Sequence, residues 1–200
     1  IVTLNLIDTD RSDCWNPLQL IIDEYLTAKH GNNDLSQTSK LVSSFAHCLT
    51  DDTQSEAIWT DSARSLLSAL IYYEKNDMSC VNMFSITTFF TEFGIYNTVI
   101  EDESGNKKEV NALDELFNAL PVGCLARTSY STSKFSQGET RSSIYTVLSG
   151  DLEIFMTDMG VQKLTSKSEI KFNDLIDIDR PCIIYMLVPY EEKSRYVIAS

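Results

Sequence analysis

The chain has 200 residues, of which 43% are hydrophobic and 22% are charged, which is ordinary for a globular protein. Its 16 basic and 29 acidic residues give a formal net charge of −13. Because nucleic-acid binding depends on cations that neutralise phosphates, this balance argues against a general DNA-binding protein. Only 7 Gly and 4 Pro are present, so little turn chemistry is available for a many-stranded β protein, and the composition favours helices.

The first element is a predicted buried strand over Ile1–Ile7, which is short and begins with apolar and β-branched residues. A helix is predicted next, with Pro17 in its first turn and Gly31 just past its end. The following two helices are each preceded by a capping box, a pattern that satisfies free backbone N–H groups at a helix start. These boxes are Asp34 with Gln37 and Thr53 with Glu56.

The segment IWTDSARSLLSALIYYE, residues 58–74, is the strongest predicted helix. Apolar residues recur in it at spacings of three and four, which is typical of a helix with one buried face. They are Trp59, Ala63, Leu66, Leu67, Leu70 and Ile71. This pattern predicts that the Trp59 ring lies in the core.

The second half of the chain alternates helices with polar connections. Helices are predicted at residues 81–93, 110–121, 123–138 and 139–159. Ser79 is a candidate cap for the first of them, although a strand over the same residues stays open. Residues 101–110 are predicted to form a charged loop and residues 161–181 a polar connector. The run CIIYMLVPY, residues 182–190, predicts a second buried strand, and a further helix begins after it.

Candidate catalytic and metal-binding residues are few and scattered. The carboxylate pairs Asp51–Asp52 and Asp114–Glu115 are interpreted as solvated acids near helix starts. His30 and His47 lack the spacing of a metal site, and the five cysteines include no CxxC pair. The SxxK match at Ser131 has neither of its usual companion motifs.

The sequence contains no GxxxxGK[ST] or GxGxxG loop to cradle phosphates. We therefore expect this segment to have no enzyme activity and no bound cofactor of its own. Since the chain begins directly in a strand-like run without Met, we expect it to be a segment of a longer protein.

Four stretches in order resemble the cytoplasmic region of the TraG/VirD4 family, the coupling proteins of type IV secretion and conjugation. A strand is followed by an aspartate and an S-x-x-W-N-P turn, and later by a W-x-x-x-A-x-x-L-L helix. A looser T-S step and a final strand complete the pattern. The matching residues are Asp8, Ser12, Trp15, Asn16, Pro17, Trp59, Ala63, Leu66, Leu67, Thr165, Ser166, Glu169 and Ile170.

The resemblance implies a mainly α fold, a helical bundle inserted between strands of a partial RecA-like α/β domain. Residues 1–16 would then be a strand and turn of the nucleotide-binding domain, residues 17–158 the all-α domain, and residues 159–200 the return to the nucleotide-binding domain. The parent would be a hexameric ATPase that uses ATP and magnesium and is anchored in the cell membrane. This segment would be a monomer on the cytoplasmic side without membrane contact.

The function implied is recognition of a relaxase, relaxosome or adaptor protein before DNA transfer, with weak or no direct DNA binding. Two alternatives are a fragment of another RecA- or AAA-type DNA motor and an acidic helical protein-interaction domain. Partner-binding candidates lie in the predicted charged loop, namely Glu101, Asp102, Glu103, Lys107 and Lys108. The residues with an expected structural role in the family motifs are Asn16, Pro17, Trp59, Ala63 and Leu67.

Overall fold

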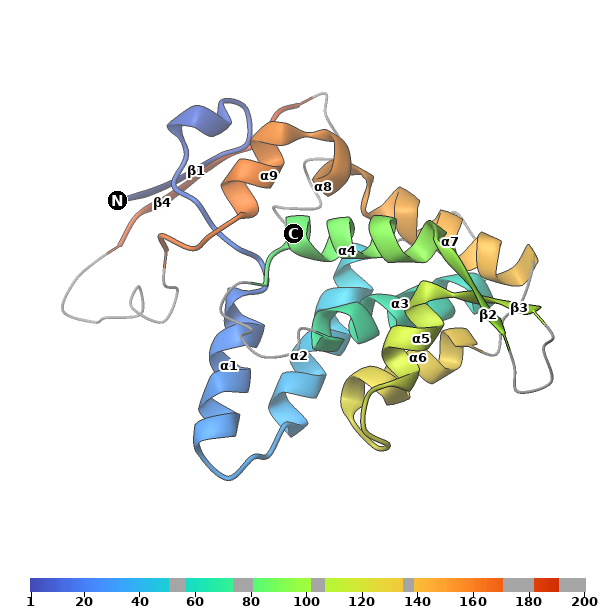
Figure 1. Cartoon of the computed structure of the whole chain (residues 1–200). Coiled ribbons are helices and arrows are strands. Elements are labelled where there is room, and N and C mark those ends of the chain that lie inside the picture. The colour runs from blue at the N-terminus through green and yellow to red at the C-terminus, as the bar shows by residue number, and fades with distance from the viewer. Residues whose placement is uncertain (51–56, 74–80, 102–106, 135–138, 171–181, 191–200) are drawn as a thin grey trace. The chain divides into compact units, whose positions relative to one another are not determined.

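A computed structural model describes residues 1–50, 57–73, 81–101, 107–134, 139–170 and 182–190 (Figure 1). Within these residues the chain is mainly helical, with nine α-helices, one short 3-10 helix and two two-stranded sheets. The chain divides into two compact units. Unit 1 comprises Ile1–Leu41, Ser79–Ser85 and Leu152–Ser200, and unit 2 comprises Val42–Met78 and Ile86–Asp151.

Unit 1 is built from the two ends of the chain. Its elements are β1 (Val2–Asn5), η1 (Thr9–Arg11), α1 (Gln19–His30), the start of α2 (Ser36–Leu49), the start of α4 (Met83–Ile95), α8 (Glu153–Thr157), α9 (Met159–Thr165) and β4 (Ile184–Leu187). The predicted helix before Gly31 is confirmed, and Gly31 donates its N–H to the Thr27 and Ala28 carbonyls. Pro17, however, lies in a turn that precedes α1 rather than in its first turn.

β1 and β4 form a parallel pair, with Val2 opposite Ile184 and Asn5 opposite Leu187 (Figure 1). The two predicted strands are therefore confirmed as strands. The prediction that the second is buried is wrong for the described residues, because all four side chains of β4 are 43–52% exposed. The pattern identified an apolar strand correctly, but a two-stranded sheet leaves that strand partly uncovered.

Unit 2 is organised around α3 (Ala57–Tyr73), which packs against α6 (Leu125–Lys134) and α7 (Glu139–Asp151). Its other elements are β2 (Asn97–Glu101), β3 (Lys107–Asn111) and α5 (Ala112–Asn118), together with most of α2 and α4. Ala63, Leu66 and Leu67 are completely buried on α3, as the helical spacing predicts. Trp59 is only partly buried, so its expected place in the core is corrected.

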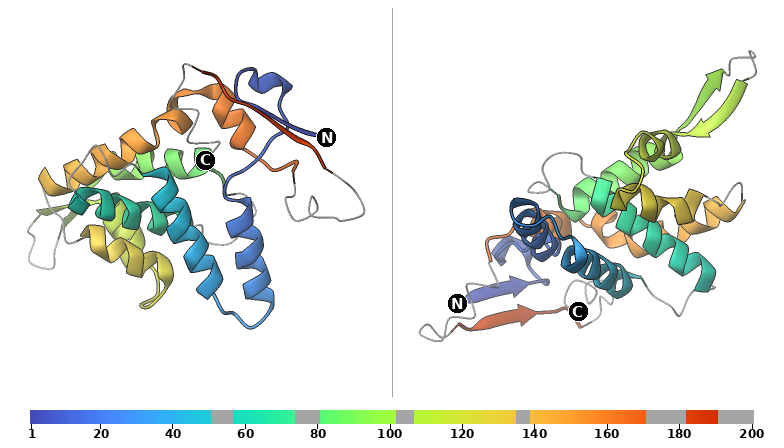
Figure 2. Two further views of the ribbon diagram at one scale, coloured as in Figure 1. Left: turned by 180° about the vertical axis from the view of Figure 1, so that it is seen from behind. Right: turned by 90° about the horizontal axis from the view of Figure 1, so that it is seen from below.

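The predicted charged loop at residues 101–110 is corrected in part to a hairpin. β2 and β3 pair antiparallel, with Asn97 opposite Asn111 and Glu101 opposite Lys107. Figure 2 shows this hairpin extending away from the helices of unit 2. The β-branched residues Val99 and Val110 suit a strand, although the surrounding charges favoured a loop.

The long helix predicted at residues 139–159 is interrupted. α7 ends at Asp151, α8 covers Glu153–Thr157, and α9 begins at Met159 and continues to Thr165, into the predicted polar connector. The physical cause of the second break is a cap, because the Asp158 carboxylate accepts the N–H groups of Gly160 and Val161 at 2.9 and 3.1 Å. The chain stays helical from 159 to 165 because Val161 and Leu164 are buried.

The segment predicted at residues 81–93 forms the helix α4, Met83–Ile95, and not a strand. Its cap is reciprocal: Ser85 donates its N–H to the Asn82 side chain at 2.9 Å, and Asn82 donates its N–H to Ser85 Oγ at 3.2 Å. The proposed cap Ser79, the Thr53–Glu56 box and the predicted final helix lie outside the described residues.

Candidate functional site

The turn between β1 and α1 is centred on Asn16, whose side chain is 3% exposed. Its Nδ2 donates to the Val81 carbonyl at 2.6 Å, and its Oδ1 accepts the Leu18 N–H at 3.1 Å. One side chain therefore fixes the start of α1 and joins it to the segment before α4. This is a role that an amide fills well, because it donates and accepts at once.

The same turn is hydrogen-bonded to the C-terminal end of α9 and to the residues that follow it. Trp15 donates its N–H to the Leu164 carbonyl at 2.8 Å, and Asn16 donates its N–H to Ser168 Oγ at 3.0 Å. Cys14 and Glu169 exchange two bonds: the Cys14 N–H reaches Glu169 Oε2 at 3.0 Å, and the Glu169 N–H reaches the Cys14 carbonyl at 2.9 Å. Two motifs that are far apart in the sequence thus form one hydrogen-bonded site, which we call the Asn16 turn (residues 14–18, 81 and 164–169).

Charges at the Asn16 turn shift two titrating groups. The Lys167 ammonium, 2.6 Å from Glu169, and then the Cys14 N–H hold the pKa of the Glu169 carboxyl below its usual range. Burial, followed by the nearby Glu169 charge, raises the pKa of the Cys14 thiol. Cys14 is therefore a poor nucleophile, because it is the thiolate that reacts.

The polar residues between β1 and the turn hold the backbone of β1. Asp13 Oδ2 accepts the Thr3 N–H at 2.8 Å, and Ser12 Oγ accepts the Asn5 N–H at 2.9 Å. Asp8 forms an exposed ion pair with Arg11 at 3.4 Å. The motif residues Asp8 and Ser12 thus help to shape the loop after β1.

Gly160 lets α9 come close to this loop. A Cβ at that position would collide with Thr9 Oγ1. An exposed ion pair of Lys163 with Asp10, 2.6 Å apart, lies at the same contact between α9 and η1. This close approach leaves no room for a side chain, which explains why glycine occupies a helical position here.

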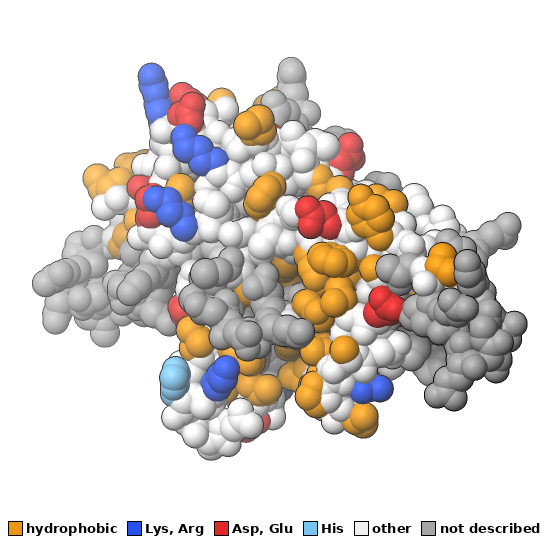
Figure 3. Space-filling model, in the orientation of Figure 1, with side chains coloured by type: hydrophobic (Ala, Val, Ile, Leu, Met, Phe, Trp, Pro, Cys, Tyr) orange, Lys and Arg blue, Asp and Glu red, His pale blue; other side chains and the backbone are white. Residues whose placement is uncertain are grey.

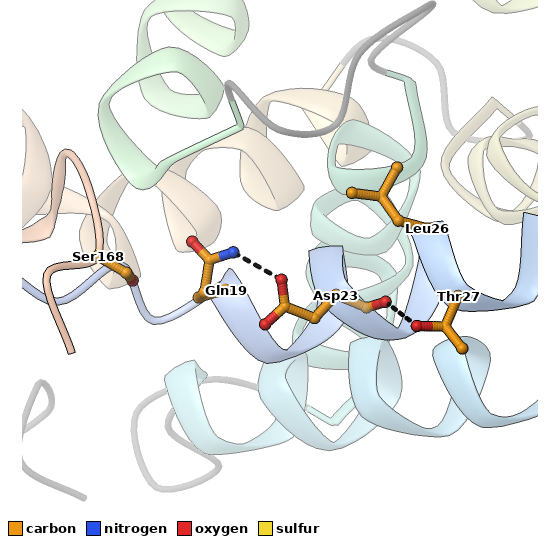
Figure 4. A pocket seen from close by; sticks show the side chains of 5 residues that line it. All are labelled: Gln19, Asp23, Leu26, Thr27 and Ser168. Atoms are coloured by element: carbon orange, nitrogen blue, oxygen red, sulfur yellow. Dashed lines mark hydrogen bonds between the residues drawn. The ribbon is translucent and has the colours of Figure 1, made fainter. Parts of the chain in front are cut away.

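A shallow groove of about 430 Å³ lies beside the Asn16 turn, lined by Gln19, Asp23, Leu26, Thr27 and Ser168 (Figure 4). Gln19 Nε2 donates to Asp23 Oδ1 at 2.8 Å, and Thr27 Oγ1 donates to the Asp23 carbonyl at 2.8 Å. These polar groups bond to one another along α1. The groove therefore gives no sign of a specific ligand.

The partner-binding candidates predicted near residues 101–109 are only partly placed. Glu101 is the last residue of β2, and Lys107 and Lys108 open β3, so the three lie at the far end of the hairpin. Asp102 and Glu103 lie outside the described residues. Asn111 fixes the other end of the hairpin: its Nδ2 donates to the Gly94 carbonyl at 2.9 Å, and its Oδ1 accepts the Leu113 N–H at 3.0 Å.

A polar cluster in unit 2 was not predicted from the sequence. Arg141 Nη1 and Nη2 donate to the two oxygens of Asp114 at 2.8 and 3.2 Å, and the Tyr130 hydroxyl donates to Asp114 at 2.9 Å. The interpretation of Asp114 as a solvated acid is thus wrong, because its side chain is 14% exposed and bidentately paired. No sequence signal linked Asp114 to Arg141, which lies on another helix.

The cluster's environment suits a structural role. Burial opposes the charge of Arg141, but the two bonds to Asp114 outweigh it and raise the pKa of the guanidinium. Burial, then the neighbouring Tyr145 and Asp114, raise the pKa of the Tyr130 hydroxyl. Both groups therefore keep their protons at neutral pH, and the cluster joins α5, α6 and α7.

Other candidate chemistry gains no support from the geometry. Within the described ranges, no three His, Cys, Asp or Glu side chains come close enough together to hold a metal ion. The sequence also contains no loop of the kind that cradles nucleotide phosphates. In the part of the chain that the structure describes, no helix is long and apolar enough to cross a membrane.

The first and last described strands form a parallel pair, with helices between them in the sequence. A comparison with protein families then identifies the class. The model of the type IV secretory system conjugative DNA transfer family matches residues 1–197, and the chain belongs to this family of TraG/VirD4 coupling proteins. Coupling proteins are ATPases. No curated protein matches the sequence.

Proposed function

We propose that this chain is the part of a coupling-protein ATPase that recognises a relaxase, relaxosome or adaptor protein before conjugative DNA transfer. In this proposal residues 17–158 form a mainly helical recognition domain that includes the β2–β3 hairpin. Residues 1–16 and 159–200 belong to a RecA-like nucleotide-binding domain. ATP, magnesium, the membrane anchor and hexamer contacts would belong to other parts of the parent protein.

The exposed parallel pair supports the division into domains. Parallel sheets occur almost only with both faces covered, and a two-stranded sheet is marginal by itself. Yet Ile184, Tyr185, Met186 and Leu187 are all 43–52% exposed. Further strands and helices of a RecA-like domain would cover these side chains.

The observation that carries the recognition role is the charge of the helical middle. Residues 17–158 contain more than twice as many Asp and Glu as Lys and Arg. Such a surface attracts basic proteins and repels bare DNA. Proteins that process DNA carry cations for phosphates, so they are suitable partners for an acidic recognition domain.

A binding experiment tests this role. The chain is immobilised and exposed in turn to the purified relaxase of its own mobile element, its adaptor proteins, and single-stranded DNA, at low and moderate salt. We expect binding of a relaxase or adaptor that weakens with salt, and little binding of DNA. Strong, salt-sensitive DNA binding without protein binding would contradict the proposal and favour direct DNA contact. An unrelated protein of similar positive charge is the control.

A further inference from the structure

The aromatic side chains of unit 2 form a continuous series. Phe93 contacts Phe89 with ring centroids 5.0 Å apart, and Phe89 stacks on Tyr73 at 4.6 Å. Tyr73 then meets Phe117 edge-on at 5.0 Å, and Phe117 stacks on Tyr130 at 4.1 Å. Phe117 is completely buried, whereas Tyr73, Phe89 and Phe93 are only partly buried. The series therefore runs from the core to the surface.

An apolar pocket of about 120 Å³ opens where this series reaches the surface. It is lined by Leu70 and Tyr73 of α3 and by Ile86 and Phe89 of α4. Figure 3 shows hydrophobic side chains gathered on the face of the molecule where α3 and α4 lie. An apolar cavity of about 150 Å³ binds one benzene ring, so this pocket has the size of a single apolar side chain.

The charge near the pocket indicates what kind of partner segment would insert a side chain into it. Glu92 is exposed on α4, one turn beyond Phe89 and on the same side of the helix. A Lys or Arg side chain beside the inserted residue is thus complementary to this carboxylate.

Resting on the recognition role proposed above, we propose that the Leu70–Tyr73–Ile86–Phe89 pocket receives one Leu or aromatic side chain from a basic segment of a protein partner. Buried aromatic anchors dominate the binding energy of such interfaces, and the charges around them guide association. The pocket supplies the apolar contact, and Glu92 supplies the nearest exposed carboxylate on α4.

Two peptides that differ at one position test the pocket. Both are short and Lys-rich, one with a central Phe and the other with Ala there, and both are titrated into the whole chain. We expect the Phe peptide to bind at least about tenfold more tightly and to shift the NMR signals of Tyr73 and Phe89. Equal affinities, or shifts confined to other residues, would overturn the proposal.

Variants of the chain separate the pocket from the general charge. Phe89→Ala removes one wall and should abolish the difference between the two peptides. Glu92→Lys leaves the wall intact and should weaken both peptides several-fold, whereas Glu24→Lys on α1 in unit 1 should not. Equal weakening by the two charge reversals would show that no local site exists. If Phe89→Ala does not fold, the peptide pair and Glu92→Lys still decide the question.

The failure of this proposal is distinguishable from failure of the recognition role. A relaxase or adaptor that binds the native chain and the Glu92→Lys and Phe89→Ala variants equally would retain the recognition role and overturn the pocket. Peptide binding at the pocket, with no binding of any relaxase or adaptor, would support the pocket and overturn the recognition role.

Discussion

The two units are held together by different kinds of interaction. In unit 1, side chains such as Asn16, Ser12 and Glu169 bond directly to backbone groups of distant segments. In unit 2, apolar and aromatic side chains fill the space between helices, and the cluster of Asp114, Arg141 and Tyr130 joins three of them. Unit 1 therefore adds several long-range side-chain-to-backbone bonds to its apolar core, whereas unit 2 relies more on packing of aromatic side chains.

This difference matters for function. In the proposed function, a hydrogen-bonded turn that specifies one geometry would suit the junction with a nucleotide-binding domain. In the same proposal, a core filled by packing would tolerate change at the surface used for recognition. Four predictions test the contrast, in order of decreasing effect.

Truncation of the unit 2 core should have the largest effect. Phe117 is fully buried between Tyr73 and Tyr130, so Phe117→Ala should cost about 3–5 kcal/mol in the free energy of unfolding. Urea denaturation measures it. Phe84, which is 49% exposed on α4, is the matched control, and Phe84→Ala should cost much less. Equal costs for the two would show that the core is not where the structure places it.

Removal of the Asn16 amide should come next. Asn16→Ala leaves the Val81 carbonyl and the Leu18 N–H without this partner, at a cost of about 2–3 kcal/mol. Asn16→Asp keeps the acceptor for Leu18 but places a buried carboxylate oxygen against the Val81 carbonyl, so it should cost at least as much as Asn16→Ala near neutral pH. Thermal unfolding compares the three. An Asn16→Ala variant with the same thermal stability as the native protein would refute the structural role of the turn.

Breaking the unit 2 ion pair should have a smaller effect. Arg141→Met leaves Asp114 with only its Tyr130 bond, and we expect it to lower the free energy of unfolding by about 2 kcal/mol. The loss is moderate because the Arg141 and Asp114 side chains are 19% and 14% exposed and so keep some solvation. The double variant Arg141→Met with Asp114→Leu should be more stable than Arg141→Met alone. If the effects of the two substitutions simply add, Asp114 and Arg141 do not interact.

The smallest effect concerns the titration of Glu169. Its pKa is lowered in the folded state, so any stabilisation it gives is present above its unfolded pKa and is lost as the pH falls through the folded pKa. Lys167→Met should raise the Glu169 pKa measured by NMR titration, since Lys167 is its largest influence. Lys163→Met, at a lysine paired with Asp10, should leave it unchanged. The opposite ranking of the lysines would contradict the geometry.

The sequence predicted those features that depend on local periodicity. The buried face of α3, the end of α1 at Gly31 and the two strands that pair in parallel all follow from short-range pattern. Trp59 was misplaced because spacing identifies a face but not how far a large ring is covered. The hairpin was missed because Lys107 and Lys108 outweighed Val99 and Val110 in a charged stretch.

The contacts that define the Asn16 turn could be predicted only in part. The motif marked Asn16 and Pro17 as structural, but nothing in the spacing showed that Asn16 reaches Val81 or that Glu169 reaches Cys14. The Asp114–Arg141 pair was likewise invisible, because both residues are common on helix surfaces. Such long-range polar contacts depend on the fold, and periodicity carries no information about them.

The pairing of β1 with β4 also has a consequence for synthesis of the chain. All of the residues of unit 2 lie between 42 and 151, so they leave the ribosome before Ile184, the partner of Val2. Unit 2 is therefore able to fold during translation before β4 is available to pair with β1. Pulse-labelling of nascent chains would show early protection in unit 2 and late protection at Val2–Asn5. A ribosome that stalls between these points would leave β1 available to pair with the wrong strand.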